Sequence, residues 1–144
     1  MPKLNFPPVR LRARRNGERI EVWDSLRGSW LVLTPEEWVR RHLIEFLAER
    51  CGMPRQRIVQ EYPVPLNGQP QRADIVVVDD NGRPSILAEC KAAGVAMDDR
   101  VLAQAVRYNS VLGAGMIILT NGIEHRCYRF DGARYSPCAL PVKR

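Results

Sequence analysis

Short stretches of alternating or continuous apolar residues, separated by turn-forming pairs, dominate the pattern of this chain. Residues 9 to 33 alternate polar and apolar positions around two such pairs, Asn16-Gly17 and Arg27-Gly28. Alternation with a period of two, interrupted by turn residues, is typical of short antiparallel strands. The pattern therefore predicts a β-hairpin extension over residues 1–34.

Two later stretches have the spacing of helices. The first begins at Thr34-Pro35-Glu36-Glu37, which has an N-cap residue, a proline at the first helical position and acids in the first turn, and it runs to about Arg50. The second covers residues 98–112 and ends at Gly113. In the second helix Val101 and Val111 share one face, which we expect to be buried against a sheet.

The remaining apolar runs predict strands. They lie near residues 57–64, 74–78, 86–91, 116–120, 125–130 and 135–140. The run at 116–120 is continuously apolar, as in a strand buried on both faces. The predicted fold class is α/β, more exactly an α+β mixed sheet with flanking helices. Residues 35–144 form the core, and the extension packs on it within a single domain overall.

Composition narrows the class of protein. The 144 residues suffice for one hydrophobic core, and 22 basic against 16 acidic residues give a formal charge of +6. Arginine dominates the basic set, which suits contacts with phosphate, although a solvated basic surface explains the charge as well. The four cysteines show no metal-ligand spacing, and no apolar segment is long enough to span a membrane. We therefore expect a cytoplasmic protein without a membrane partner.

Three charged residues form the candidate chemistry. Glu89 and Lys91 are two apart on a strand, so their side chains point the same way. Asp74 begins the preceding apolar run, which the turn-forming segment 79–84 joins to the strand of Glu89 as a hairpin. Two carboxylates and a lysine on adjacent strands are the parts needed to bind a divalent metal and activate water. The plainer alternative is a pair of strand-edge acids matched by arginines such as Arg72.

The order of these residues resembles a known superfamily. Asp74, Glu89-Cys90-Lys91 and the stretch from Gln104 to Tyr108 look like the Asp…Glu-x-Lys…Gln-xxx-Tyr signature of PD-(D/E)XK nucleases. Over residues 30 to 130 the chain more narrowly resembles the N-terminal nuclease domain of type I restriction enzyme R subunits. The motifs that carry this likeness are 35–40, 72–77, 89–91 and 119–122. The resemblance implies a restriction-endonuclease-like core with four strands.

It also implies a chemistry, that of a magnesium-dependent endodeoxyribonuclease in which manganese can replace magnesium. In this family the metal would be held by Asp74, Glu89 and the backbone carbonyl of Cys90. Lys91 would orient the attacking water, and Gln104 and Tyr108 would hold the lysine and the nearby DNA backbone. An acid of the first helix often joins the metal. Of the three candidates there, Glu36, Glu37 and Glu45, we select Glu37, although first-turn acids are ordinarily explained by the helix dipole.

The expected partner is DNA, contacted at its phosphates by Arg72, Arg40 and Arg41, unless these form surface ion pairs instead. A motor or specificity subunit, or a second copy of the chain in a homodimer, would supply selectivity, because the sequence shows no base-reading motif. The alternative function is a non-catalytic DNA-binding or assembly module of a restriction, defence or DNA-repair system. Nuclease action on RNA is a third reading.

Overall fold

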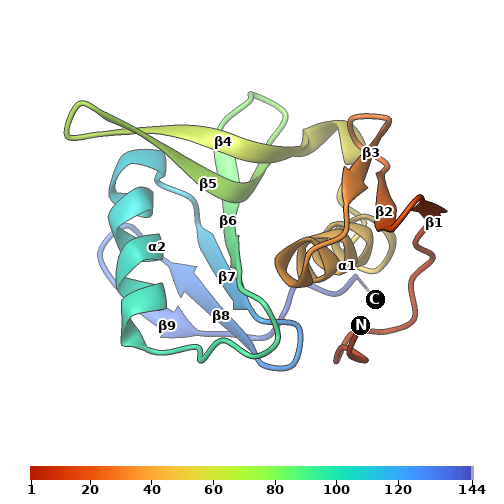
Figure 1. Cartoon of the computed structure of the whole chain (residues 1–144). Helices are drawn as coiled ribbons and strands as arrows, with labels where there is room; N and C mark the ends of the chain where they lie inside the picture. Colours follow the sequence, from red (N-terminus) through yellow and green to blue (C-terminus); the bar gives the residue numbers. More distant parts are fainter. Residues whose placement is uncertain (144) are drawn as a thin grey trace.

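The structure is a computed structural model that describes residues 1–143, and these residues form two β-sheets and two α-helices (Figure 1). The smaller sheet is antiparallel and consists of β1 (Ala13–Asn16), β2 (Arg19–Asp24) and β3 (Ser29–Val32), in that order. This sheet is the predicted extension. The division into residues 1–34 and 35–144 stays a prediction, and its last residue, Arg144, lies outside the described residues.

The larger sheet has six strands in sequence order. Its strands are β4 (Ile58–Leu66), β5 (Gln69–Val78), β6 (Pro84–Cys90), β7 (Met116–Thr120), β8 (His125–Phe130) and β9 (Tyr135–Pro137). All neighbours are antiparallel except β6 and β7, which run parallel because a helix crosses between them. The sheet is mixed, as predicted, but two strands wider than the expected core of four. Strand β9 is shorter than the predicted 135–140.

Both predicted helices are present with the expected caps. Helix α1 spans Pro35–Glu49, and the side chain of its N-cap Thr34 accepts a hydrogen bond from Glu37 N. Helix α2 spans Asp99–Leu112 and ends at Gly113, whose φ of 68° is the left-handed conformation that glycine adopts without strain. Within the described residues neither helix is long and apolar enough to cross a membrane.

Each helix covers one face of the six-stranded sheet. Helix α1 packs through Val39, Leu43 and Phe46 on one hydrophobic cluster, whereas α2 packs through Val101 and Ala105 on a second cluster. Figure 1 shows α1 and α2 on opposite sides of β6 and β7. The central strands are consequently buried from both sides.

The position predicted for Val111 is wrong. Val111 was expected on the buried face of α2, but this residue is 42% exposed. The buried stripe of α2 instead consists of Val101, Ala105, Tyr108 and Asn109. At about 100° per residue, a residue ten positions after Val101 lies about 80° around the helix from it, on the side away from Ala105 and Asn109.

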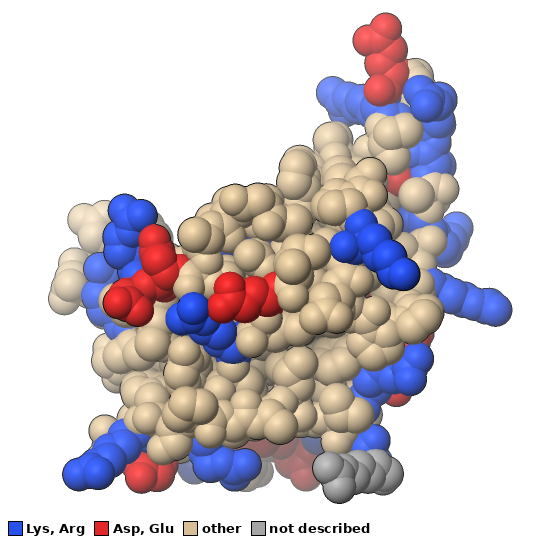
Figure 2. Space-filling view, turned by 90° about the horizontal axis from the view of Figure 1, so that it is seen from below, with Lys and Arg blue, Asp and Glu red and all other residues tan. Residues whose placement is uncertain are grey.

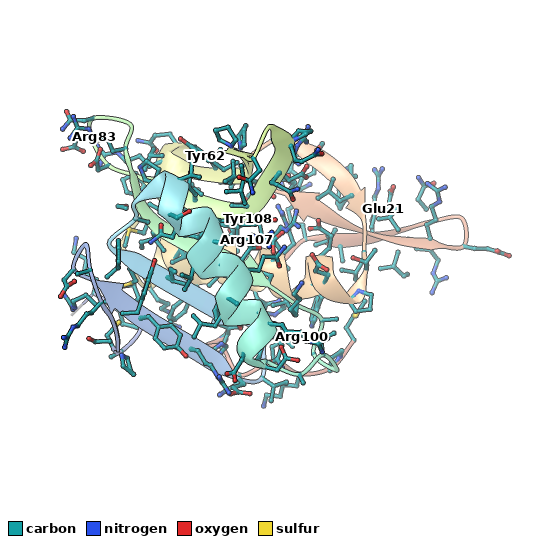
Figure 3. The ribbon with its side chains drawn as sticks, turned by 90° about the vertical axis from the view of Figure 1, so that its left-hand side faces the viewer. Glu21, Tyr62, Arg83, Arg100, Arg107 and Tyr108 are labelled. Atoms are coloured by element: carbon teal, nitrogen blue, oxygen red, sulfur yellow. The ribbon has the colours of Figure 1, made fainter. Side chains whose placement is uncertain are left out.

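The extension is anchored at its base and free at its tip. Val22 and Asp24 of β2 are fully buried against the core, and Asn5 N donates to Gly122 O at 2.7 Å, which ties the start of the chain to the turn after β7. All four residues of β1 are exposed. The β1–β2 hairpin projects from the molecule as an arm (Figure 3).

Candidate active site

Asp74 of β5 and Glu89 of β6 meet on neighbouring strands. Ile75 pairs with Ala88, so one further step of this antiparallel register places Asp74 opposite Glu89, with their side chains on the same face. Glu89 Oε2 accepts a hydrogen bond from Asp74 N at 3.4 Å, and Asp74 Oδ2 accepts one from Cys90 N at 2.8 Å. The hairpin therefore brings the two carboxyl groups together.

Strand β4 is distorted at the same level. Its pairing with β5 joins Gln60 to Ile75 and Tyr62 to Ala73, so Glu61 between them lies opposite Asp74. Glu61 has a φ of 52°, a left-handed conformation that is uncommon for a residue with a long side chain. Such outliers cost about 1 to 3 kcal/mol and gather at functional sites. The strain marks this point of the sheet as specialised.

Burial and the neighbouring Asp74 favour the protonated form of Glu89. Glu89 is only 7% exposed, and burial raises its pKa well above 4.5, with further increases from a hydrogen bond to Asp74 and from the charge of Asp74. Asp74 accepts hydrogen bonds from Cys90 N and from Arg40 Nη2. Glu89 Oε1 is buried without a hydrogen-bond partner among the described residues. A buried polar atom without a partner is costly, and a cation would satisfy it.

Lys91 follows β6 directly. Its backbone N donates to Thr120 O of β7 at 2.9 Å, which continues the parallel pairing one residue beyond the strand. Its ammonium charge acts on Glu89 and lowers the pKa of that carboxyl, against the larger effect of burial. The half-buried side chain lines a shallow pocket together with Asp98, Arg100 and Gln104. The lysine thus lines this pocket and is close enough to Glu89 to affect its pKa.

Gln104 of α2 lines the same pocket and begins a series of side-chain hydrogen bonds. Gln104 Nε2 donates to Tyr108 Oη at 3.1 Å, and Tyr108 Oη donates to Gln71 Oε1 of β5 at 3.3 Å. Figure 3 shows Tyr108 on α2. These contacts provide partners for the glutamine amide and the buried tyrosine hydroxyl. Gln71 was not foreseen, because residues three apart on a strand point to opposite faces and its spacing from Asp74 gives no signal.

The acid selected on the first helix is engaged elsewhere. Glu37 forms ion pairs with Arg40 and with Arg41, each at 3.2 Å. Glu45 pairs with Arg55. These contacts leave neither acid directed at the carboxyl pair, although no observation tests the metal ligation predicted for Glu37.

Glu36 is an acid of α1 whose pKa responds to the charge of Asp74. Partial burial raises its pKa, the charge of Asp74 raises it further, and Arg40 and Lys91 act in the opposite direction. A carboxyl group whose pKa responds to both Asp74 and Lys91 belongs to the same electrostatic site. Glu36, which pairs with Arg40 at 3.6 Å, is therefore a second candidate beside the selected Glu37.

The three arginines predicted to contact DNA occupy very different surroundings. Arg41 is 2% exposed and pairs with Asp24 at 2.9 Å, so its guanidinium is part of the core and the predicted phosphate contact is wrong for this arrangement. Arg40 is 8% exposed and contacts Asp74 at 3.3 Å, so it faces the carboxyl pair rather than open solvent. Arg72 is exposed, with a surface ion pair to Glu61 at 3.3 Å. Its contact with DNA stays a prediction.

The donor set fits a divalent ion with few protein ligands. Among the described residues no group of three or more His, Cys, Asp or Glu side chains is arranged to hold a metal. Magnesium, however, keeps several waters and usually takes only one or two carboxylates. The Asp74–Glu89 pair provides that number, and Glu89 Oε1 has no hydrogen-bond partner among the described residues.

The fold is a mixed α+β domain that has a counterpart among solved structures. The structure is similar to the crystal structure of a proposed nuclease belonging to DUF820 from Anabaena variabilis ATCC 29413. The two share 12% sequence identity with a TM-score of 0.50, and the likeness covers 90% of this chain and 85% of the other. At this identity the likeness concerns the fold.

Sequence comparison then gives the family. The family model described as type I restriction enzyme R protein N terminus matches residues 35–138, and the chain belongs to this family. A comparison with curated proteins found no match. The resemblance to this family that was drawn from the motifs at 35–40, 72–77, 89–91 and 119–122 is thereby confirmed. Family and fold together support a nuclease-like function.

Proposed function

We propose that this chain is a metal-dependent endodeoxyribonuclease that hydrolyses phosphodiester bonds of DNA. The observation that carries the proposal is the Asp74–Glu89 pair on adjacent strands, in which burial raises the pKa of Glu89 and Glu89 Oε1 has no hydrogen-bond partner among the described residues. A pair of this kind destabilises the free protein, because burial disfavours its second charge. Membership of the restriction-enzyme family supports DNA as the substrate.

Asp74, Glu89 and the Cys90 carbonyl would hold Mg²⁺, or Mn²⁺ in its place, and Glu36 would add a ligand directly or through water. When bound, the ion would lower the pKa of a water molecule and offset negative charge on the phosphate. Glu89 must first release its proton, so we expect the site to load more readily as the pH rises.

The other side chains act on the substrate. The ammonium group of Lys91, at the open side of the pair, would donate to a phosphate oxygen and orient the attacking water. Gln104 lines the pocket beside Lys91, and Tyr108 connects its amide to Gln71 of β5. This chain of hydrogen bonds fixes the amide relative to the catalytic strand, which is the positioning that a reactive geometry requires.

One contact favours the alternative of a non-catalytic module. Arg40 Nη2 lies 3.3 Å from Asp74 Oδ1, and the guanidinium also pairs with Glu37, so an internal cation already stands beside the carboxylate. If Arg40 replaces the metal, the pair is a structural ion pair and the domain binds DNA or partner subunits without cleaving. Direct measurement of Mn²⁺ binding separates the two functions.

Cleavage itself is tested with purified protein on supercoiled, linear and single-stranded DNA, and on RNA, in Mg²⁺, Mn²⁺ or chelator. We expect cleavage of DNA with either metal and none in chelator. Lys91→Ala should abolish it, whereas Lys3→Ala, which removes an exposed lysine near the start of the chain, should retain it. Absence of cleavage with either metal, or full activity of Lys91→Ala, would contradict the proposal.

A further inference from the structure

The outer face of the N-terminal sheet carries a cluster of arginines held on tryptophan rings. Trp23 of β2 and Trp30 of β3 are cross-strand neighbours with ring centroids 5.2 Å apart. The guanidinium of Arg12 lies 4.8 Å from the centroid of Trp23, and that of Arg14 lies 4.3 Å from the centroid of Trp30. Stacking of this kind restricts the guanidinium planes and leaves their N–H groups available.

These side chains share the face directed away from the core. Arg14 pairs with Glu21 across the sheet, and alternation along the strands puts Arg12, Trp23 and Trp30 on the same side. The opposite face contains Val22 and Asp24, which are fully buried. The sheet thus binds the protein with one face and presents arginines with the other.

The projecting β1–β2 hairpin extends this basic surface. Its arginines are all exposed: Arg10, Arg12, Arg14, Arg15 and Arg19. The acids of the hairpin are Glu18 near the turn and Glu21, which is 8% exposed and already paired with Arg14 at 2.8 Å. Figure 2 shows basic side chains gathered along a projecting arm with an acidic side chain at its tip. The surface lies outside residues 35–138, which match the family.

A series of charged contacts connects the sheet to the carboxyl pair. Arg27, in the turn between β2 and β3, contacts Glu61 at 3.3 Å. Glu61 contacts Arg72 at 3.3 Å and Arg40 at 3.7 Å, and Arg40 contacts Asp74. The base of the N-terminal sheet therefore lies next to the candidate active site, and the arm leads outward from it.

We propose that this outer face, defined by Arg12, Arg14, Arg19, Trp23 and Trp30, binds the phosphates of duplex DNA that flanks the position of cleavage. Fixed guanidinium groups suit phosphate recognition, and a two-stranded β-ribbon has the width that a major groove admits. The inference rests on the proposed function in that its ligand is DNA. It adds a binding site that is separate from the carboxyl pair.

The test compares two triple variants with the same change in charge. The arm variant carries Arg10→Gln, Arg12→Gln and Arg19→Gln, because the exposed Arg10 lines the same pocket as Arg12 and Trp23, and it leaves the Arg14–Glu21 pair intact. The control variant carries Arg50→Gln, Arg83→Gln and Arg134→Gln, three exposed arginines outside the arm. Affinity for duplex DNA is measured by fluorescence anisotropy in chelator at several salt concentrations, after thermal melting has shown that both variants fold.

We expect the arm variant to bind at least about tenfold more weakly than wild type near 0.1 M salt, with a salt slope reduced by about 2 to 3, since each phosphate contact contributes about 0.9. The control variant should stay within about twofold of wild type. Equal weakening of both variants, an unchanged arm variant, or a loss confined to single-stranded DNA would overturn the inference.

Cleavage assays separate this inference from the proposed function. If wild type binds and cleaves DNA and the arm variant does so equally well, only the role of the arm is refuted. If wild type neither binds nor cleaves DNA, the proposed function is refuted, and DNA binding by the arm is refuted with it.

Discussion

Replacing Glu89 with glutamine should stabilise the metal-free protein in a manner that depends on pH. The folded state raises the pKa of Glu89 well above 4.5, so at pH 7 this carboxyl is neutral in the folded protein and ionised in the unfolded chain. Folding therefore takes up a proton, and the contribution of Glu89 to stability is fully present below pH 4.5 and is lost as the pH rises toward the folded-state pKa. Glutamine has nearly the same shape and no proton to exchange.

The size of this stability difference at pH 7 follows from the ionisation of Glu89 in the unfolded chain. Between the usual pKa of 4.5 and pH 7 lie about 2.5 pH units at about 1.36 kcal/mol each, so ionisation of Glu89 in the unfolded chain lowers stability by about 3 kcal/mol. This value holds as long as the folded-state pKa lies well above 7. It is a large share of the roughly 5 to 15 kcal/mol that stabilises an ordinary domain.

Denaturant unfolding of wild type and Glu89→Gln from pH 4 to pH 9, without divalent metal, measures the difference. We expect the two proteins to be similar near pH 4, and the variant to be more stable by about 3 kcal/mol at pH 7. Glu18→Gln, which removes an exposed carboxyl in the β1–β2 turn, is the matched control and should differ from wild type by less than about 0.5 kcal/mol throughout. A constant difference across the pH range would refute the reasoning.

Three further outcomes test other parts of the account. Gly122→Ala should destabilise the fold by about 1 to 3 kcal/mol in thermal melting, because Gly122 has a φ of 87° and an added Cβ would lie 2.7 Å from a carbon of Leu4. Gly132 has a φ of 99° with no atom near an added Cβ, so Gly132→Ala measures the backbone strain alone. Glu61→Gln should bind duplex DNA several-fold more tightly, because it releases Arg27 and Arg72 from Glu61 and one of them can then contact a phosphate. Unchanged affinity in an anisotropy titration would refute this. Tyr108→Phe keeps the buried ring but loses the hydroxyl that joins Gln104 to β5, so kcat should fall roughly tenfold while the melting temperature changes little; a protein that melts early would show that the hydroxyl is mainly structural.

The parts of the site that lie close together in the sequence were predictable. Asp74 and Glu89 are joined by one turn, so alternation and turn chemistry suffice to place them opposite each other. Gln104 and Tyr108 are four apart on one helix, and their hydrogen bond follows from helical geometry.

The parts that depend on packing between distant elements were not predictable. Arg41 resembles any surface arginine in the sequence, and its burial depends on Asp24 of β2 and Gln60 of β4, which meet it only in the folded protein. The choice between Glu36 and Glu37 depends on the rotation of α1, about 100° per residue, which periodicity alone does not fix. Both acids pair with Arg40 in the folded protein, Glu36 at 3.6 Å and Glu37 at 3.2 Å, and the metal ligation predicted for Glu37 stays a prediction.

Metal binding with a count of protons tests the central claim most directly. If Asp74 and Glu89 hold a divalent ion, Glu89 must lose the proton that burial and Asp74 retain on it. Calorimetric titration of Mn²⁺ at pH 7, in buffers of different ionisation enthalpy, should show about one proton released for each ion bound by wild type, and binding should be lost in Glu89→Gln. Binding without proton release, or equal binding by Glu89→Gln, would contradict the assignment of this pair as the metal site.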